Sequence, residues 1–392
     1  MSQLTQIIKS LICKSGPITF DRFMEAALYH PEHGYYSSGK AKIGKEGDYY
    51  TSPCVHPAFG EILSRFICRA YETIHAPDFT VVEMGAGRGF LALDILDSIK
   101  RNSPELYDRL GYSIVELSPN LREEGKTILK EHIHKIRWVN SLSDLESESI
   151  CGVFISNELI DSFPFHRARF KNGELLEIFV ALRDGEFVEI LDKPSSSALR
   201  EYFEGYDLDF ENEQEVEINL RARKWLSDIS RVLAKGLVLT IDYGYLAPEL
   251  FNPSRMRGTF LCFYKHTTNE NPYTNIGEQD ITAHVDFSNL IRVGESVGLN
   301  TIKYTTQGQF LVDWGILDIA ERYSVKEESP DLPSQKDIIA IKGLFLPELM
   351  GNRFKVLIQG KNLVYEAETF YPQSPFRIGF QKHTDRYDPN KE

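Results

Sequence analysis

The sequence predicts an α/β fold built on a doubly wound, mostly parallel sheet. The main observation is an apolar, β-branched run, Phe79–Met84, that leads into Gly85, Gly87 and Gly89 and then into leucines and isoleucines at helical spacing. Other short apolar runs alternate with helical stretches along the chain, at 112–116, 136–139, 152–156 and 237–241. Strands that alternate with helices are typical of a parallel sheet covered by helices on both faces.

The glycine turn is a candidate ligand site. Glycines at every second position allow positive φ and leave no Cβ between the backbone and a ligand, and the next helix directs free N–H groups there. The dinucleotide fingerprint is G-x-G-x-x-G, whereas this chain has G-x-G-x-G with Glu83 two residues before it. A carboxylate opposes a pyrophosphate but suits S-adenosylmethionine, which carries an ammonium, a sulfonium and no phosphate. The alternative is an ordinary tight turn in which Glu83 is a satisfied strand-end residue.

Bulk composition narrows the class of protein. A chain of 392 residues, 42% of them hydrophobic, can bury a full core. Its net charge of −13 argues against binding of nucleic acid or of an anionic membrane and favours a cationic partner. Its 5 cysteines form no C-x-x-C pair, His30 and His33 lack a third ligand in register, and we expect no metal site. No apolar run is long enough for a membrane span, residues 1–15 lack leader features, and we expect a cytoplasmic protein.

Seven segments are expected. Asn172-Gly173 and Asp184-Gly185 separate three alternating strands, which is typical of a β-meander. The segments are a helical cap with a cofactor-covering loop (1–75), the first part of the α/β domain (76–164), the β-meander insertion (165–217), a return to the sheet (218–244), a second insertion (245–280), the rest of the α/β domain (281–365) and a tail (366–392).

Polar residues follow several of the predicted strands. Glu116 ends the second strand, where a carboxylate usually binds a ribose diol. The loop at 140–142, after the third strand, is a candidate for contact with an adenine. After the fourth strand, Glu158 and Asp161 would share a face if they lie on one helical turn.

Taken together, these motifs resemble the MidA-like family of class I S-adenosylmethionine-dependent methyltransferases, whose members include a protein arginine methyltransferase. The stretches that match are Gly47–Pro53, Val81–Gly89, Val115-Glu116, Asn157–Asp161, Asp242–Gly244, Thr282–Phe287, Gly308–Phe310 and Met350–Lys355. The resemblance implies a seven-strand sheet with an antiparallel last strand. Family members often carry an acid after the third strand, where this chain has Asn140-Ser141.

The resemblance also implies an activity, protein arginine N-methylation, with a protein as substrate. Two carboxylates, Glu158 and Asp161, are expected to bind the guanidinium and leave one nitrogen nucleophilic. His284 and Asp286 are candidates for substrate contact or proton acceptance. The expected cofactor contacts are Glu83, Gly85, Gly87, Gly89, Glu116, Leu117, Leu142, Asn157, Tyr50 and Ser52.

Three alternatives stay open at this point. The same fold could methylate a small molecule or another side chain, because fold does not determine substrate. The chain could be a non-catalytic assembly protein, or an NAD-dependent oxidoreductase, which the glycine spacing and Glu83 disfavour. The sequence does not specify the substrate protein, the number of methyl groups or the oligomeric state.

Overall fold

The computed structural model describes residues 2–38, 52–324, 335–363 and 370–372, and its centre is a seven-strand sheet. The order is β15-β16-β10-β5-β2-β3-β4, with a short β14 beside β10. The strands are β2 (Phe79–Met84), β3 (Gly111–Val115), β4 (Ile136–Val139), β5 (Ile150–Asn157), β10 (Leu233–Tyr245), β14 (Val285–Asp286), β15 (Asn300–Thr306) and β16 (Phe354–Lys361). Strands β4, β3, β2, β5 and β10 are parallel, and β16 is antiparallel to both its neighbours. The doubly wound sheet with an antiparallel last strand is confirmed.

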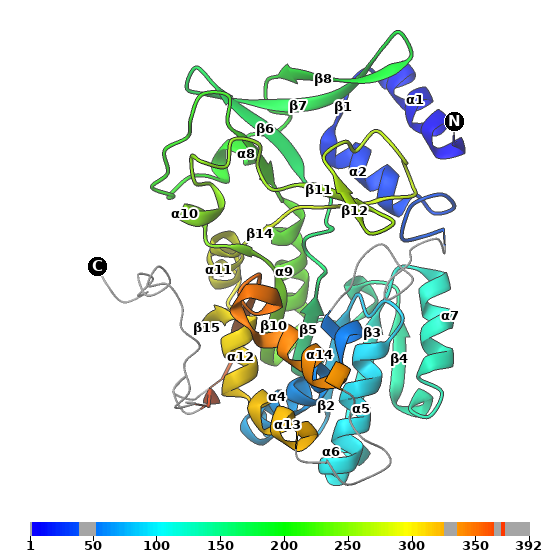
Figure 1. Cartoon of the computed structure of the whole chain (residues 1–392), viewed down its shortest axis with the longest axis vertical. Helices are drawn as coiled ribbons and strands as arrows, with labels where there is room; N and C mark the ends of the chain where they lie inside the picture. The colour runs from blue at the N-terminus through cyan, green and yellow to red at the C-terminus, as the bar shows by residue number, and fades with distance from the viewer. Residues whose placement is uncertain (1, 39–51, 325–334, 364–369, 373–392) are drawn as a thin grey trace.

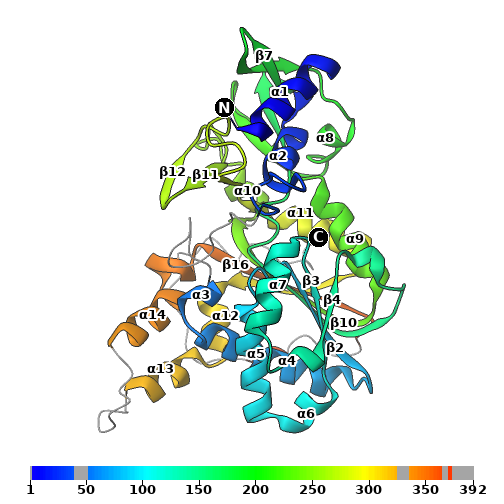
Figure 2. The same ribbon diagram turned by 90° about the vertical axis from the view of Figure 1, so that its right-hand side faces the viewer.

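Helices cover both faces of this sheet because its central strands are apolar on both faces. Val81 and Val82 of β2 pack into two different hydrophobic clusters, as successive residues of a strand should. One cluster contains α4 (Ala58–Ile74), α5 (Phe90–Asn102), α6 (Pro104–Arg109), α12 (Gln307–Asp313), α13 (Ile316–Ser324) and α14 (Gln335–Phe345). The other contains α9 (Arg221–Val232) and α11 (Phe287–Ser296), and Figure 2 shows α9 and α14 on opposite sides of the sheet.

A second, antiparallel sheet forms the upper part of the molecule in Figure 1. It contains β1 (Ile18–Thr19), β6 (His166–Lys171), β7 (Glu174–Arg183), β8 (Glu186–Asp192) and β9 (Glu215–Ile218). Asn172, Gly173, Asp184 and Gly185 all have positive φ, so the two predicted hairpin turns of the β-meander are present. Helices α1 (Gln3–Ser15) and α2 (Phe20–Tyr29) and the small sheet β11 (Leu261–Tyr264), β12 (Thr267–Asn269) and β13 (Asp280–Thr282) pack with it. We call residues 2–38, 165–218 and 245–283 the cap lobe.

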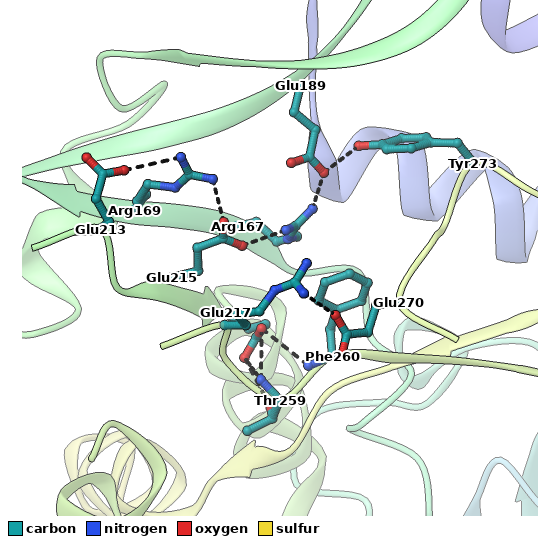
Figure 3. A network of polar contacts seen from close by, with 11 residues as sticks. Arg167, Arg169, Glu189, Glu213, Glu215, Glu217, Thr259, Phe260, Glu270 and Tyr273 are labelled. Carbon is teal, nitrogen blue, oxygen red and sulfur yellow. Dashed lines mark hydrogen bonds and ion pairs between the residues drawn. The ribbon is translucent and has the colours of Figure 1, made fainter. Parts of the chain in front are cut away.

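Arg167 joins the parts of the cap lobe (Figure 3). Its guanidinium donates to Glu189 of β8 and, at 2.7 Å, to Glu215 of β9. The same group lies 4.4 Å from the ring centre of Phe260 and 5.1 Å from that of Phe20. Segments that are far apart in the sequence therefore share one buried cation.

The described residues also form several shorter helical segments. They are α3 (Ser52–Val55), α7 (Pro119–Ile128), α8 (Ala198–Glu201), α10 (Ala247–Leu250), η1 (Ile133–Lys135), η2 (Leu142–Asp144) and η3 (Pro347–Gly351). Of the expected tail, 366–392, only 370–372 are described, and Phe370 and Tyr371 are buried in the core. Within the described ranges, no helix has both the length and the apolar character that crossing a membrane requires.

Candidate active site

A cavity of about 590 Å³ lies at the carboxyl ends of the central strands. Strand order reverses between β2 and β5, and ligands of open α/β sheets bind at such a switch point. Its volume is in the range of ligand pockets. Eight of the predicted site residues line it: Glu83, Gly85, Gly87, Glu116, Leu117, Leu142, Asn157 and Glu158. Tyr50 lies outside the described residues, and Ser52 contacts the site through Glu158.

The glycine turn needs its glycines for conformation and for space. Gly85, Gly87 and Gly89 have φ of 67°, 55° and 85°, in the left-handed region that side chains disfavour. A Cβ on Gly85 would lie 2.7 Å from Leu159 Cδ1, and one on Gly89 would lie 2.9 Å from Leu129 Cδ1. Gly89 is also the N-cap of α5, so the helix starts at the turn, as predicted.

The Glu116 carboxylate holds the turn from the next strand. Its two oxygens accept hydrogen bonds from Gly87 N at 3.1 Å and from Ser118 N at 2.8 Å. A carboxylate has about four acceptor positions, so Glu116 keeps the capacity to accept from a diol. The next residue, Leu117, is 67% exposed beside the cavity, which is unusual for a leucine and fits a surface that a ligand covers.

Glu83 is a buried carboxylate in the wall of the cavity. Tyr112 Oη donates to its Oε2 at 2.6 Å, and no basic side chain among the described residues forms an ion pair with it. Burial raises the pKa of Glu83 to about 7; the Tyr112 hydrogen bond opposes this shift, and the nearby Glu116 adds to it. A cation beside Glu83 would compensate the buried charge, and the ammonium of S-adenosylmethionine is such a cation.

This arrangement predicts that S-adenosylmethionine affinity rises with pH between pH 5.5 and pH 7. Below its raised pKa, Glu83 is mostly protonated and cannot pair with the ammonium, so affinity should change by up to about tenfold per pH unit and level off above. Calorimetric titration at several pH values measures this directly. In Glu83→Gln the slope should disappear, and a slope that persists there would assign the effect to another group.

The loop after β4 has Asn140-Ser141 where family members often have an acid, but it contains an acid further on, Asp144. Asp144 Oδ2 accepts hydrogen bonds from Asn140 N at 3.0 Å and Ser141 N at 3.3 Å, so this carboxylate is bound to the loop's own backbone. Leu142 is buried and lines the cavity with Asn140 and Ser141. The sequence analysis did not identify Asp144, although Ser141 and Asp144 have the spacing of a capping box.

The loop after β5 is not helical, so the expectation that Glu158 and Asp161 share a helical face is wrong. Glu158 has a φ of 52°, which turns the chain sharply at the end of the strand. Its Oε1 accepts hydrogen bonds from Ser52 N at 3.0 Å and from Asn157 Nδ2 at 2.9 Å. The neighbouring Asn157 Oδ1 is buried and has no hydrogen-bond partner among the described residues, and Asn157 lines the cavity. An acceptor without a partner at this position fits a ligand that carries donors.

Asp161, His284 and Asp286 line a different, small cavity of about 20 Å³, which has room for about one water molecule. Asp286 Oδ1 caps α11 by accepting from Asn289 N at 3.1 Å, and its Oδ2 accepts from two tyrosine hydroxyls. His284 lies beside Tyr243 and Tyr245, and burial lowers its pKa to about 4. The structure therefore does not bring the two predicted substrate contacts, His284 and Asp286, to the large cavity.

Two groups of site residues were missed by the sequence analysis. Asp242, at the end of β10, accepts hydrogen bonds from the backbone of the loop after β5; its strand-end position was the available signal. The far end of the large cavity is formed by Glu25 and Tyr29 of α2 and by Arg221 and Trp225 of α9. No local pattern identifies α2 as part of the site, because α2 lies far in the sequence from β6 and β7, which it contacts.

Relatives of this chain are protein arginine methyltransferases by name. The protein arginine methyltransferase NDUFAF7 of Xenopus laevis is 29% identical over 375 residues, covering 88% of this chain and 81% of the relative. The Homo sapiens protein of that name is 27% identical over 382 residues, covering 90% and 82%. A crystal structure from Burkholderia thailandensis, bound to S-adenosyl-homocysteine, matches with a TM-score of 0.84 at 28% identity over 95% of both chains.

These relatives correct one expectation. Both named proteins are mitochondrial, which contradicts the cytoplasmic location that we expected. The expectation was based on the lack of a long apolar run and of leader features in residues 1–15, and neither observation identifies a compartment.

A family model described as S-adenosyl-L-methionine-dependent methyltransferase matches residues 62–305, more than half of the chain. The matched range includes the glycine turn, Glu116 and Glu158, and the resemblance to MidA-like methyltransferases is confirmed. This chain therefore belongs to the family of S-adenosylmethionine-dependent methyltransferases.

Proposed function

We propose that this enzyme is a protein arginine N-methyltransferase that transfers a methyl group from S-adenosylmethionine to a guanidino nitrogen. The observation that carries the proposal is the Glu158 carboxylate, which lines the cofactor cavity directly after β5. The names of the relatives support the same substrate class.

The surroundings of Glu158 suit a cationic substrate. The negative charge of Asp242 raises the pKa of Glu158. The charges of Glu158 and Asp280 in turn raise the pKa of Asp161. Burial raises the pKa of Glu158 to about 8, with hydrogen bonds from Ser52 N and Asn157 opposing the shift and Asp242 adding to it. A guanidinium beside this group would favour its ionised form and relieve the repulsion among the buried acids.

Glu158 has the chemistry that arginine methylation requires. A carboxylate can bind two guanidinium nitrogens side by side, which draws positive charge toward them and leaves the third nitrogen more nucleophilic. Bound S-adenosylmethionine supplies an electrophilic methyl on a sulfonium. As the third nitrogen attacks the methyl carbon and the sulfur–methyl bond breaks, the guanidinium gives up one proton, and we propose that Glu158 accepts it from one of the two nitrogens that it binds. Asp161, enclosed behind the loop, would act on Glu158 through its charge rather than by touching substrate.

The far end of the cavity would receive the rest of the substrate. Phe163 and Trp225 form an edge-to-face pair with ring centres 6.2 Å apart, and Tyr29 lies in the same wall. Arg221 Nη1 donates to Glu25 Oε1 at 2.8 Å across the rim, so this end combines apolar surface with charge. Such a wall, built by both the cap lobe and α9, fits a protein segment better than a small molecule.

The test is to incubate a mitochondrial lysate with the enzyme and methyl-labelled S-adenosylmethionine, followed by mass spectrometry of proteins and small molecules. We expect labelled arginine in one or a few proteins, and none when S-adenosyl-homocysteine is in excess. Label only on lysine or only in small molecules would contradict the arginine proposal while leaving the methyltransferase assignment intact.

A further inference from the structure

The loop that carries Glu158 has no regular secondary structure, and one buried side chain holds it. Asp242 is 1% exposed at the end of β10. Its Oδ2 accepts hydrogen bonds from three successive backbone N–H groups, those of Leu159 at 3.2 Å, Ile160 at 2.8 Å and Asp161 at 3.4 Å. Its Oδ1 accepts from Tyr243 N at 2.9 Å. Converging N–H groups of this kind form a concave site for an anion, and here a side chain occupies it.

Only a carboxylate satisfies this arrangement. Both oxygens accept, and neither carries a hydrogen that would face the surrounding N–H groups. An asparagine of the same shape has one acceptor and one donor, so its amide would oppose either Tyr243 N–H or the three loop N–H groups. The choice of acid over amide at residue 242 is therefore set by the backbone around it.

The loop that Asp242 holds carries Glu158, the proposed substrate contact, and also packs against the glycine turn of the cofactor site. Glu158 N donates to Ile241 O at 2.9 Å, so the turn at φ 52° is anchored to the residue before Asp242. The next residue, Leu159, contacts the glycine turn, because a Cβ on Gly85 would meet its Cδ1. A displacement of this loop would move the Glu158 carboxylate and the packing under the cofactor turn together.

We propose that Asp242 is a positioning residue for methyl transfer, which sets the place of Glu158 through the loop at 158–161 and its ionisation through its own negative charge. The inference rests on the proposed role of Glu158. Positioning matters because a small displacement of a reacting group costs large factors in rate.

The pH dependence of the rate distinguishes the effect of the Asp242 charge from its effect on loop geometry. Asp242 raises the pKa of both Glu158 and Asp161, so its removal should lower the pKa of Glu158. On β16, Lys355 pairs with Asp242 in the sheet, but its Nζ donates to Asn352 O. Among the described residues, other titratable or charged groups around this cluster are Tyr29 of α2, Tyr243 of β10, Asp280 of β13 and Arg353 before β16. Glu217, His284 and Asp286 line the small cavity together with Asp161.

The experiment compares Asp242→Asn with the wild type in the full chain. The readouts are S-adenosylmethionine affinity by calorimetry and the initial rate of label transfer to lysate protein from pH 6 to pH 9. We expect the rate at pH 8 to fall about 10- to 100-fold. We also expect the midpoint of the rise of rate with pH to move down, because a like charge near Glu158 is gone.

The matched control is Glu177→Gln in the cap lobe, which makes the same change from acid to amide at a fully buried carboxylate. Glu177 Oε2 accepts from Ser195 N at 2.5 Å, and Oε1 pairs with His166 Nδ1 at 2.7 Å. This variant should leave the pH midpoint unchanged. An unchanged rate in Asp242→Asn, or a lower rate with an unmoved midpoint, would overturn the inference, and so would an equal midpoint shift in the control.

A second measurement needs no variant and covers the case in which Asp242→Asn does not fold. Amide hydrogen exchange of a peptide spanning 158–163 in the wild type should show protection at pH 8 that weakens below pH 7, after correction for intrinsic exchange. Burial raises the pKa of Asp242 to about 7, and the protonated acid is a poorer acceptor. Constant protection across this range would overturn the inference. Failure of Glu158→Gln to lose activity would instead remove the proposed role of Glu158.

Discussion

Glu158→Gln is expected to lower the rate of methyl transfer by about 10²- to 10⁴-fold, the range that a general base contributes. Glutamine keeps the shape of the side chain, and its amide oxygen can still accept from Ser52 N and Asn157 Nδ2. It has no charge with which to hold a guanidinium or to take up a proton. S-adenosylmethionine affinity should stay within about threefold, because Glu83 and Glu116 are unchanged, and calorimetry measures this beside the rate.

The matched control is Glu25→Gln, at another glutamate that lines the same cavity. Glu25 is paired with Arg221 at the rim, so its loss should reduce the rate by less than about tenfold. Retained turnover in Glu158→Gln would assign the catalytic role to a different residue. An equal loss in both variants would indicate a general effect of charge in the cavity.

The wild-type rate should also rise with pH as Glu158 ionises. The pKa of Glu158 is raised to about 8, so the protonated, inactive form dominates below that pH and the rate should increase up to tenfold per unit. Bound substrate would move the midpoint of kcat below that of kcat/KM, since a neighbouring cation favours the carboxylate. A flat profile between pH 6 and pH 8 would contradict an ionising Glu158.

The central sheet could be predicted because its information is local. Strands β2 and β4 have the predicted bounds, since turn residues flank a short apolar run in each case. Strand β10 is longer than predicted and runs from Leu233 to Tyr245, because pairing with β5 and β16 extends it past the apolar centre. The glycine turn and Glu116 were predicted for the same reason: the motif and its strand lie in one short stretch.

The cap lobe could not be predicted as a unit because distant pairings assemble it. Ile18 of β1 pairs with Val180 of β7, and Arg167 contacts Phe20 and Phe260 from different segments. Each segment alone looks like a helix pair, a meander or an irregular insertion. The far wall of the active-site cavity, which includes Tyr29, was missed with it.

The loop after β5 was misread because another strand determines its path. Helical spacing suggested a shared face for Glu158 and Asp161, but the path of the loop is set by the Asp242 carboxylate of β10, which accepts hydrogen bonds from three of its N–H groups. Asp286 is a different case. Asp286 precedes a helical run, so the sequence could have predicted that it is an N-cap. We interpreted it as a substrate contact because it lies in a stretch that matches the family.

Gly85→Val is expected to weaken S-adenosylmethionine binding by at least about 100-fold, which corresponds to about 2.7 kcal/mol. Gly85 has a φ of 67°, where a β-branched residue is strongly disfavoured, and its Cβ would lie 2.7 Å from Leu159 Cδ1. Because Leu159 Cδ1 ends a flexible side chain that can turn aside, the main cost is in the backbone, which must leave its positive-φ conformation and lose its close approach to a ligand. Calorimetry with S-adenosylmethionine measures the loss, and thermal unfolding shows whether the fold persists.

Gly173→Val is the matched control, because it makes the same substitution at a positive-φ glycine that does not line the cofactor cavity. Gly173 has a φ of 81° in a hairpin turn of the cap lobe, and a Cβ there would have nothing within 4 Å. The control should lose stability through strain, about 1–2 kcal/mol, and keep its cofactor affinity. Equal affinity losses in the two variants would mean that general destabilisation, and not the shape of the cofactor turn, is responsible. Unchanged affinity in Gly85→Val would mean that cofactor binding does not require a backbone without a side chain at this turn.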